Sequence, residues 1–306
     1  MNATAKLDVY SRVTNKILAD LEKGELTWLK PWNAEPAAGR MRRPRRANGV
    51  LYRGINILLL WGSALEQGFA SPFWLTFKQA DALGAHVRKG EKGSLVVYAD
   101  TIHKTETDKD SGEEVEKDIP FMKAYTVFNA DQIEDLPAHY PPALPESPAV
   151  LVADRDAALD RFFRNTGATI RETGDKASYS VALDVVKMPP FPAFRDAESF
   201  YATLAHEMTH WTRHPSRLDR DFGRKKWGDE GYAKEELVAE LGAAFLCADL
   251  DITPEIREDH AAYITSWLKA LKDDKRFIFS TAAHAQRAVD HLHSYQQQEE
   301  AKLVAA

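Results

Sequence analysis

Five prolines within the thirteen residues LPAHYPPALPESP constrain the fold of this chain more than any other feature of its sequence. Proline fixes φ and has no backbone N–H, so a run of this density interrupts helices and central strands alike. Proline-rich segments form stiff, extended spacers instead. The sequence therefore predicts two domains, residues 1–136 and 149–306, with a linker over residues 137–148 between them. The 306 residues are enough for each domain to bury a core of its own.

Residues 1–136 mix helical and strand patterns, which predicts an α+β fold. In KLDVYSRVTNKILADLEKG the apolar residues recur at the spacing of one helix face, whereas GSLVVYADTI and FMKAYTVFNA are short apolar runs typical of strands. The polar residues between those two runs are expected to form the exposed tip of a long hairpin. Helices are expected over 6–24, 55–68 and 72–84, and strands over 93–102 and 121–130.

Residues 149–306 are expected to form a mainly helical domain with a small sheet. One strand is predicted within ASYSVALDVVKMP. If that strand lies at the edge of the sheet beside a cleft, it would bind an extended peptide by backbone pairing. Helices are expected over 153–167, 196–214, 232–250, 256–272 and 278–298, and strands over 168–174 and 177–189.

The stretch YATLAHEMTHWTRHPSRLDR contains the pattern that points most directly to chemistry. His206 and His210 are four residues apart, so one helix face can direct both imidazoles at a single metal ion. Glu207 lies beside that site, where its carboxylate can take a proton from a metal-bound water and later pass it to a leaving amine. Asp196 is a suitable N-cap for this helix. The alternative is a polar helix face that happens to be rich in histidine.

A catalytic zinc needs a third protein ligand and an open position for water. His214 is not expected to be that ligand, because it lies about 12 Å along the helix axis from His206. Pro215 also ends the helix there. We therefore expect His214 to be exposed, or to lie behind the ligands.

A second helix, predicted in YAKEELVAELGAAFL, supplies the missing ligand. Glu236 and Glu240 share one helix face, whereas Glu235 is expected to point elsewhere. Glu236 is the predicted ligand, and Glu240 is predicted to accept a hydrogen bond from a histidine N–H. These two roles could be exchanged, and a salt-bridged surface stripe is the alternative for all three. The expected ion is Zn²⁺, although Mn²⁺ and Co²⁺ suit similar ligands.

Residues 1–100 are basic, with 15 Lys and Arg against 9 Asp and Glu, although the whole chain has a net charge of −6. Guanidinium groups neutralise phosphates and aromatic faces stack on unpaired bases, so a single-stranded nucleic acid is the predicted partner. The alternative is a solubilising basic loop whose aromatic residues belong to the core. The side chains assigned to DNA are Trp32, Arg40, Arg42, Arg43, Arg45, Arg46, Tyr52 and Arg53.

The single cysteine, Cys247, excludes an internal disulfide and is expected to be a buried apolar residue. No apolar run approaches the roughly 18–20 residues of a membrane helix, and the N-terminus lacks an apolar signal core. We therefore expect a cytoplasmic protein with no membrane partner.

Over nearly its whole length the chain resembles the ArdC family of plasmid-encoded antirestriction proteins. The resemblance rests on LYRGINILLLW and FWLTFKQADALGAHVRKGEKGSLVVY in the first domain, and on FYATLAHEMTHWTRHPSRLDR and YAKEELVAELGAAFL in the second. The last of these also resembles the third-ligand helix of IrrE-like peptidases, in which Glu236 matches the ligand position and Glu240 a position one turn later.

The resemblance implies an N-terminal single-stranded-DNA-binding domain and a C-terminal zincin-like metallopeptidase domain. It also implies protection of incoming plasmid DNA from host restriction during conjugation, and a protein bound to DNA as the peptidase substrate. A second hypothesis is a binding module that coats single strands, with a metal site that is structural or inactive. A negatively charged mimic of duplex DNA fits poorly, because the first domain is basic.

Overall fold

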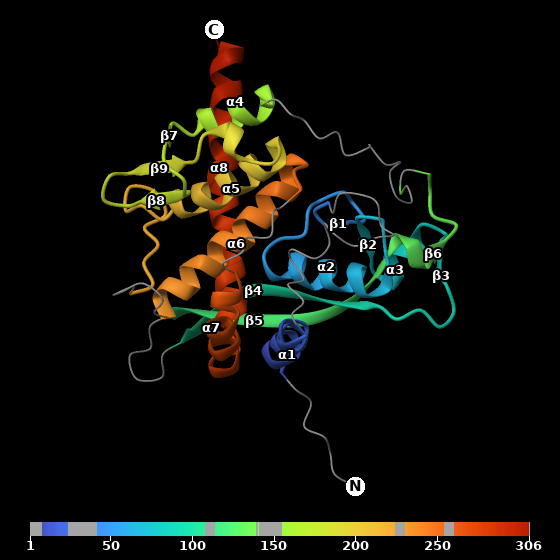
Figure 1. The fold of residues 1–306 in the computed structure, drawn as a ribbon. Coiled ribbons are helices and arrows are strands. Elements are labelled where there is room, and N and C mark those ends of the chain that lie inside the picture. The colour runs from blue at the N-terminus through green and yellow to red at the C-terminus, as the bar shows by residue number, and fades with distance from the viewer. Residues whose placement is uncertain are drawn as a thin grey trace.

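The computed structural model describes residues 8–23, 42–107, 114–138, 140, 155–223, 230–253 and 260–305. Most of the predicted linker lies outside these residues. Two mixed units of helix and sheet follow one another along the chain (Figure 1). The predicted α+β class with two domains is confirmed.

The N-terminal unit is built around a four-stranded sheet in the order β1-β2-β5-β4. Strand β1 pairs parallel with β2, and the other pairs are antiparallel. The short strands β3 and β6 form a separate antiparallel pair. Its elements are α1 (Val9–Glu22), β1 (Arg45–Arg46), α2 (Ile55–Gln67), β2 (Phe73–Leu75), α3 (Phe77–Ala82), β3 (His86–Val87), β4 (Ser94–Thr107), β5 (Glu114–Asn129) and β6 (Ile133–Glu134).

One expectation for this unit is wrong, because residues 72–84 do not form a single helix. Phe73–Leu75 forms β2, and α3 begins only at Phe77. Thr76 separates the two elements, because its side chain accepts a hydrogen bond from the Gln79 backbone N–H while the Gln79 side chain bonds back to Thr76. Such a capping box starts a helix and fixes the extended residue before it.

The hairpin of β4 and β5 is longer than expected. Both strands continue into the polar segment, and their ladder extends to the pair Thr107 and Glu114. Backbone pairing therefore persists where side-chain hydrophobicity has ended, since ladder hydrogen bonds do not depend on apolar side chains.

The C-terminal unit packs helices around a small sheet in the order β7-β9-β8. Among the described residues, strand β8 pairs antiparallel with β9 and lies at one edge of the sheet. The predicted helices are present, although the last one, expected over 278–298, continues to Ala305. The expected strand over 177–189 is wrong, because this segment turns at residues 181–184 and forms two strands instead of one. The elements of this unit are α4 (Ala157–Asn165), β7 (Thr169–Glu172), β8 (Ser178–Ser180), β9 (Val185–Met188), α5 (Ala197–Trp211), α6 (Glu230–Leu250), α7 (His260–Asp273) and α8 (Phe277–Ala305).

Helices α5 and α6 pack unusually closely, and a glycine makes this possible. A Cβ atom on Gly242 would lie 2.5 Å from the Thr209 methyl carbon, nearer than real Cβ contacts allow. Helix α5 begins at the predicted cap, because the Asp196 carboxylate accepts the Ser199 backbone N–H. The histidine-containing helix therefore has a fixed start and a fixed neighbour.

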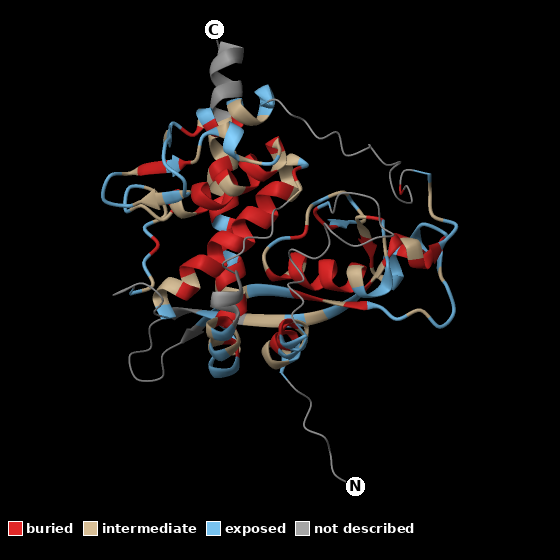
Figure 2. Ribbon diagram, viewed as in Figure 1, coloured by how far each residue is buried: buried red, intermediate tan, exposed pale blue. Residues whose placement is uncertain are grey.

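The two units share a buried contact. Trp61 of α2 meets Phe245 of α6 edge to face, with ring centroids 5.9 Å apart. The Thr14 hydroxyl of α1 donates to the Lys275 carbonyl at 2.8 Å. Figure 2 shows buried residues along α2, α5, α6 and α8. One hydrophobic cluster includes side chains from all four helices.

Cys247 is fully buried on α6, as expected, and burial raises the pKa of its thiol far above the usual range. A thiol with so high a pKa is an apolar packing group rather than a nucleophile. Among the described helices, none combines the length and apolar character needed to cross a membrane.

Candidate metal centre

Helix α5 presents His206, Glu207 and His210 in the interior of the C-terminal unit. His206 is 2% exposed and Glu207 is 3% exposed. The apolar side chains of Phe200, Tyr201 and Leu204 bury the same helix and keep it from rotating. Polar side chains at this depth need partners, because an unpaired buried charge is costly.

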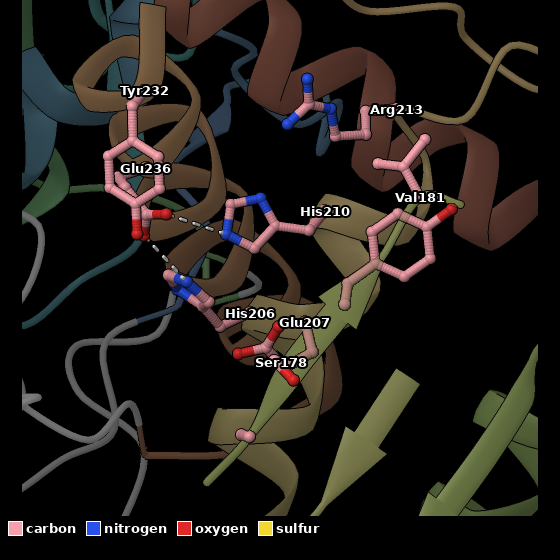
Figure 3. Close-up of a pocket in the computed structure, with 10 residues that line it drawn as sticks. Ser178, Val181, His206, Glu207, His210, Arg213, Tyr232 and Glu236 are labelled. Carbon is pink, nitrogen blue, oxygen red and sulfur yellow. Dashed lines mark ion pairs between the residues drawn. The ribbon is translucent and has the colours of Figure 1, made fainter. Parts of the chain in front are cut away.

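Helix α6 supplies those partners. Glu236 Oε2 lies 3.6 Å from His206 Nε2, and Glu236 Oε1 lies 3.6 Å from His210 Nε2. Ligand atoms of these three residues all lie within 4.8 Å of one another. Figure 3 shows both imidazole rings directed at the Glu236 carboxylate. The structure thus brings together the three residues that the sequence predicts as ligands.

The other nitrogen of each imidazole faces a second carboxylate. Glu240 Oε1 lies 3.2 Å from His206 Nδ1, and Glu235 Oε1 lies 3.0 Å from His210 Nδ1. A neutral imidazole that donates from Nδ1 carries its lone pair on Nε2, the nitrogen that faces Glu236. Carboxylates behind the ring nitrogens in this way fix the tautomer and orientation of histidine ligands.

The expectation that Glu235 points elsewhere is wrong. Glu235 is 2% exposed and forms a two-pronged ion pair with Arg220, in which Nε and Nη2 both donate at 2.8 Å. Arg220 also donates to the Thr209 carbonyl at 2.9 Å, which ties it to α5. The Glu235 carboxylate lies in the interface between α5 and α6 because Arg220, fifteen positions earlier in the chain, neutralises its charge there.

Sequence reasoning missed Arg220 altogether. Its segment, HPSRLDR, follows α5 directly, which was the available signal that its arginines could return to the helix. The pairing with Glu235 depends on how the chain turns after α5. Asp219 has a φ of +45°, a left-handed conformation within that turn. A sequence pattern does not specify such a turn.

Charge and burial act together on this cluster. Burial alone would lower the pKa of His210, but the charge of Glu236 and a hydrogen bond with Glu235 raise it to about 10. Burial alone would raise the pKa of Glu235, but Arg220 and His210 lower it to about 2. The charge of His210 and the hydrogen bonds from both histidines likewise hold the pKa of Glu236 below its usual range. Three carboxylates around two imidazoles therefore attract positive charge.

A polar cavity of about 210 Å³ opens onto these residues. Figure 3 shows the Glu207 carboxylate near Ser178 and the Arg213 side chain at the other end of the cavity. Ser178 and Tyr179 belong to β8, the edge strand, so an unpaired strand edge lies beside the site. The lining residues are Ala177, Ser178, Tyr179, Val181, His206, Glu207, His210, Arg213, Tyr232 and Glu236.

The donor set fits a divalent cation. Two imidazole nitrogens and one carboxylate are the ligands of many zinc sites, and an accessible cavity leaves room for water beside them. His214 does not belong to the set, because its ring accepts from the Ser216 backbone and meets the Ser216 hydroxyl at 2.8 Å. It is partly exposed, as expected.

The predicted DNA-binding residues fall into three groups. Trp32 and Arg40 lie outside the described residues. Arg42, Arg45 and Arg46 are exposed. Arg53 is exposed as well but forms an ion pair with Asp290 of α8.

The assignments of Arg43 and Tyr52 to DNA are wrong. Arg43 is 4% exposed and holds the two units together, donating to Gln286 at 2.9 Å and pairing with Asp249 at 3.3 Å. Tyr52 is 7% exposed and packs in a core cluster, beneath the guanidinium of Arg46. Composition could not separate these two from their exposed neighbours, because the burial of Arg43 depends on where α8 lies and that of Tyr52 on where α2 and the sheet lie.

Comparison with known proteins agrees with this architecture. Residues 157–284 match the model of a zincin-like metallopeptidase domain, and residues 7–128 match the N-terminal domain of the anti-restriction factor ArdC. The chain therefore joins a zincin-like unit to an ArdC-type N-terminal unit. It belongs to the ArdC family of antirestriction proteins, which confirms the resemblance seen in its sequence.

Solved relatives share the whole fold. A metal-free crystal structure of the antirestriction protein ArdC from plasmid R388 is 47% identical, with a TM-score of 0.82, and covers 95% of this chain and 99% of that one. A Mn(II)-bound structure of the same protein is 46% identical, with a TM-score of 0.79, and covers 94% and 98%.

Curated relatives include the uncharacterised protein y4eC of Sinorhizobium fredii, 41% identical over 94% of this chain and 92% of that one. The DNA primase TraC of Escherichia coli is 36% identical over 97% of this chain. This chain spans only 28% of that primase, so the similarity concerns one part of TraC.

Proposed function

We propose that this protein is a metal-dependent peptidase joined to a single-stranded-DNA-binding unit, and that it protects incoming plasmid DNA from restriction during conjugation. The observation that carries the peptidase half is the convergence of His206, His210 and Glu236 beside Glu207, in a cavity bordered by an edge strand. The antirestriction half rests on membership of the ArdC family.

His206, His210 and Glu236 would hold the ion, with Glu240 and Glu235 holding the two imidazole rings from behind. When bound, the ion polarises a peptide carbonyl and lowers the pKa of water. The Glu207 carboxylate would accept a proton from a water as the water oxygen bonds to the carbonyl carbon, and would return that proton to the amine nitrogen as the C–N bond breaks. Strand β8 aligns an extended substrate through backbone hydrogen bonds. In this arrangement Glu207 supplies acid–base chemistry, and the carboxylates behind the rings supply orientation.

Zn²⁺ is the ion we propose first, because two histidines and a glutamate suit its coordination. Mn²⁺ and Co²⁺ suit similar ligands, and the R388 relative has a Mn(II)-bound structure. The proposed substrate is a protein attached to the DNA that the N-terminal unit binds. Exposed Arg42, Arg45 and Arg46 supply part of the positive charge for that binding.

The test compares conjugation of an unmodified plasmid into a restricting recipient with wild-type protein and with Glu207→Gln. Glutamine keeps the size of the side chain but cannot accept the proton, so protection and peptide cleavage should each fall at least about 100-fold. Metal content should stay at about one ion per chain, because Glu207 is not a proposed ligand. Glu198→Gln, on the first turn of the same helix, is the matched control.

The DNA-coating hypothesis makes the opposite forecast. If Glu207→Gln protects as well as wild type, while a double charge reversal at Arg45 and Arg46 abolishes protection, the peptidase half of the proposal is wrong. The protein would then act by binding DNA alone.

A further inference from the structure

One face of the β4–β5 pair carries exposed aromatic rings. Residues directly opposite one another in an antiparallel pair share a face, and here Val96 is opposite Tyr125, Tyr98 is opposite Lys123, and Asp100 is opposite Phe121. Val96 is buried against α2 and β2. Beyond Val96 the face opens, so that Tyr98 is 44% exposed and Tyr125 is 45% exposed. Figure 2 shows exposed and intermediate colours along this part of the hairpin.

The three rings on this face form one group. Tyr98 and Phe121 have centroids 6.1 Å apart, and Tyr98 and Tyr125 have centroids 6.4 Å apart. The Tyr98 hydroxyl donates to Asp100, which fixes the orientation of its ring. Exposed rings held in place present flat apolar surfaces at little entropic cost, since few rotamers are lost when a ligand covers them.

Cationic groups accompany the rings. Lys123 Nζ lies 5.1 Å from the centroid of the Phe121 ring. Arg46 of β1 is near enough that its positive charge opposes the rise in the pKa of Tyr98 caused by the Asp100 hydrogen bond. Arg45 and Arg46 are exposed at the other edge of the same sheet. Asp100 is a negative charge on the face, so stacking should contribute more here than electrostatic attraction.

We propose that Tyr98, Phe121 and Tyr125 form the surface on which this protein stacks the bases of single-stranded nucleic acid, with Lys123 and Arg46 beside the phosphates. The inference rests on the DNA-binding half of the proposed function and gives it a location. Aromatic faces with interspersed cations are the means by which sheets bind single strands without sequence preference.

Exposed rings favour an unpaired strand over a duplex, because the bases of a duplex are stacked on one another and leave no free faces. Each of the three rings can take one unstacked base of an extended strand. Lys123 beside the Phe121 ring and the exposed arginines of β1 add positive charge, which suits the phosphates of a nucleic acid.

The test measures fluorescence anisotropy of a labelled oligo(dT) of about 20 nucleotides, a length that covers the usual site sizes, with the full chain. Tyr98→Ala and Tyr125→Ala should each weaken binding about tenfold, which corresponds to about 1.4 kcal/mol. Tyr125→Phe keeps the ring and should bind within twofold of wild type. Phe77→Ala is the matched control, because Phe77 is an aromatic residue of the same unit with 60% exposure.

Salt dependence separates stacking from charge. The tyrosine variants remove no charge and should keep the wild-type slope of affinity against salt concentration. Lys123→Ala should reduce that slope by about 0.7, the contribution of one phosphate contact on a single strand. An oligonucleotide that contains 5-iododeoxyuridine should cross-link to peptides that contain Tyr98 or residues 121–125.

Two results would overturn the inference and one would overturn its premise. If both tyrosine variants bind oligo(dT) with wild-type affinity and the cross-links map elsewhere, the DNA-binding site lies on another surface. Tyrosine variants that change sedimentation but not DNA affinity make the face a contact between copies of the chain. Failure of the wild-type protein to bind oligo(dT) removes the DNA-binding proposal itself.

Discussion

The candidate metal centre between α5 and α6 and the open face of β4–β5 hold their side chains in opposite ways. At the candidate metal centre, His210 is held by Glu235, and Glu235 is held in turn by Arg220. On the open face, the ring of Tyr125 meets Tyr98 at 6.4 Å and remains 45% exposed. A metal site must fix its ligands to within a fraction of an ångström, whereas stacking on a flexible strand tolerates variation.

The two regions differ in how much their side chains depend on fixed partners. The buried carboxylates beside His206 and His210 repel one another, so they need fixed partners to stay in place. The open face leaves apolar rings exposed to water, which is typical of surfaces that bind a ligand or a partner. Variants at the two regions should therefore differ both in size and in kind of effect.

The largest effect is expected at the proposed ligands. His210→Ala removes one of three ligands and should reduce the bound metal from about one ion per chain to a trace, as measured by mass spectrometry of the metal in dialysed protein. His214→Ala, one turn along the chain, should retain the full amount. Equal metal content in both variants would break the contrast between the two histidines and contradict the proposed site.

A large effect on stability is expected from Arg220→Met. The substitution leaves Glu235 buried without its ion-pair partner, which should lower the free energy of unfolding by about 3–5 kcal/mol. Metal affinity should fall about 10- to 100-fold, because Glu235 no longer holds His210 firmly. Urea unfolding and metal titration measure the two effects. The double variant with Glu235→Gln should recover part of the stability, and an unchanged metal affinity would show that the pair is only structural.

An intermediate effect is expected where the two helices touch. Gly242→Ala forces a methyl group against Thr209 and should cost about 1–3 kcal/mol of unfolding free energy. Separation of α5 from α6 should also weaken metal binding, since the ligands lie on both helices. Adding Thr209→Ala makes room for the methyl group and should restore part of both losses. Full stability in the single variant would mean that the helices are free to move apart.

The smallest effect is expected on the open face. Tyr125→Ala should change the free energy of unfolding by no more than about 0.5 kcal/mol, because exposed side chains away from caps and networks contribute little. Thermal or urea unfolding without ligand measures this directly. A loss of several kcal/mol would show that the ring belongs to a packed core, and the comparison between the two regions would fail.

Periodicity and spacing predicted helices α5 and α6, the shared face of His206 and His210, and either Glu236 or Glu240 as the carboxylate directed at them. This worked because a helix places residues four apart on one face whatever surrounds it. The same reasoning failed for Glu235, since its partner Arg220 comes from the turn after α5. Helical geometry fixes the direction in which a side chain leaves the helix, but the partners of its charged group determine where that group lies.

The basic segment, residues 40–53, also shows that sequence patterns do not predict which side chains are buried. Six arginines in residues 40–53 look alike in composition. The packing of α8 makes Arg43 a buried tie to Asp249 and Gln286, while Arg45 and Arg46 stay exposed. The aromatic residues assigned to DNA were also chosen by their place in this segment, and the sequence pattern did not point to the exposed rings of β4 and β5 that we propose as a stacking surface. Alternation along a strand does not say which face another element covers.

The sequence by itself determined the two-unit α+β architecture, the family and the helix faces that bear the predicted ligands, because local periodicity and motif spacing act over a few residues. Only the tertiary structure decided which carboxylate stands behind which imidazole, which arginine is buried, and which sheet face stays open. Those outcomes depend on contacts between elements far apart in the chain, where burial and charge pairing set the energy.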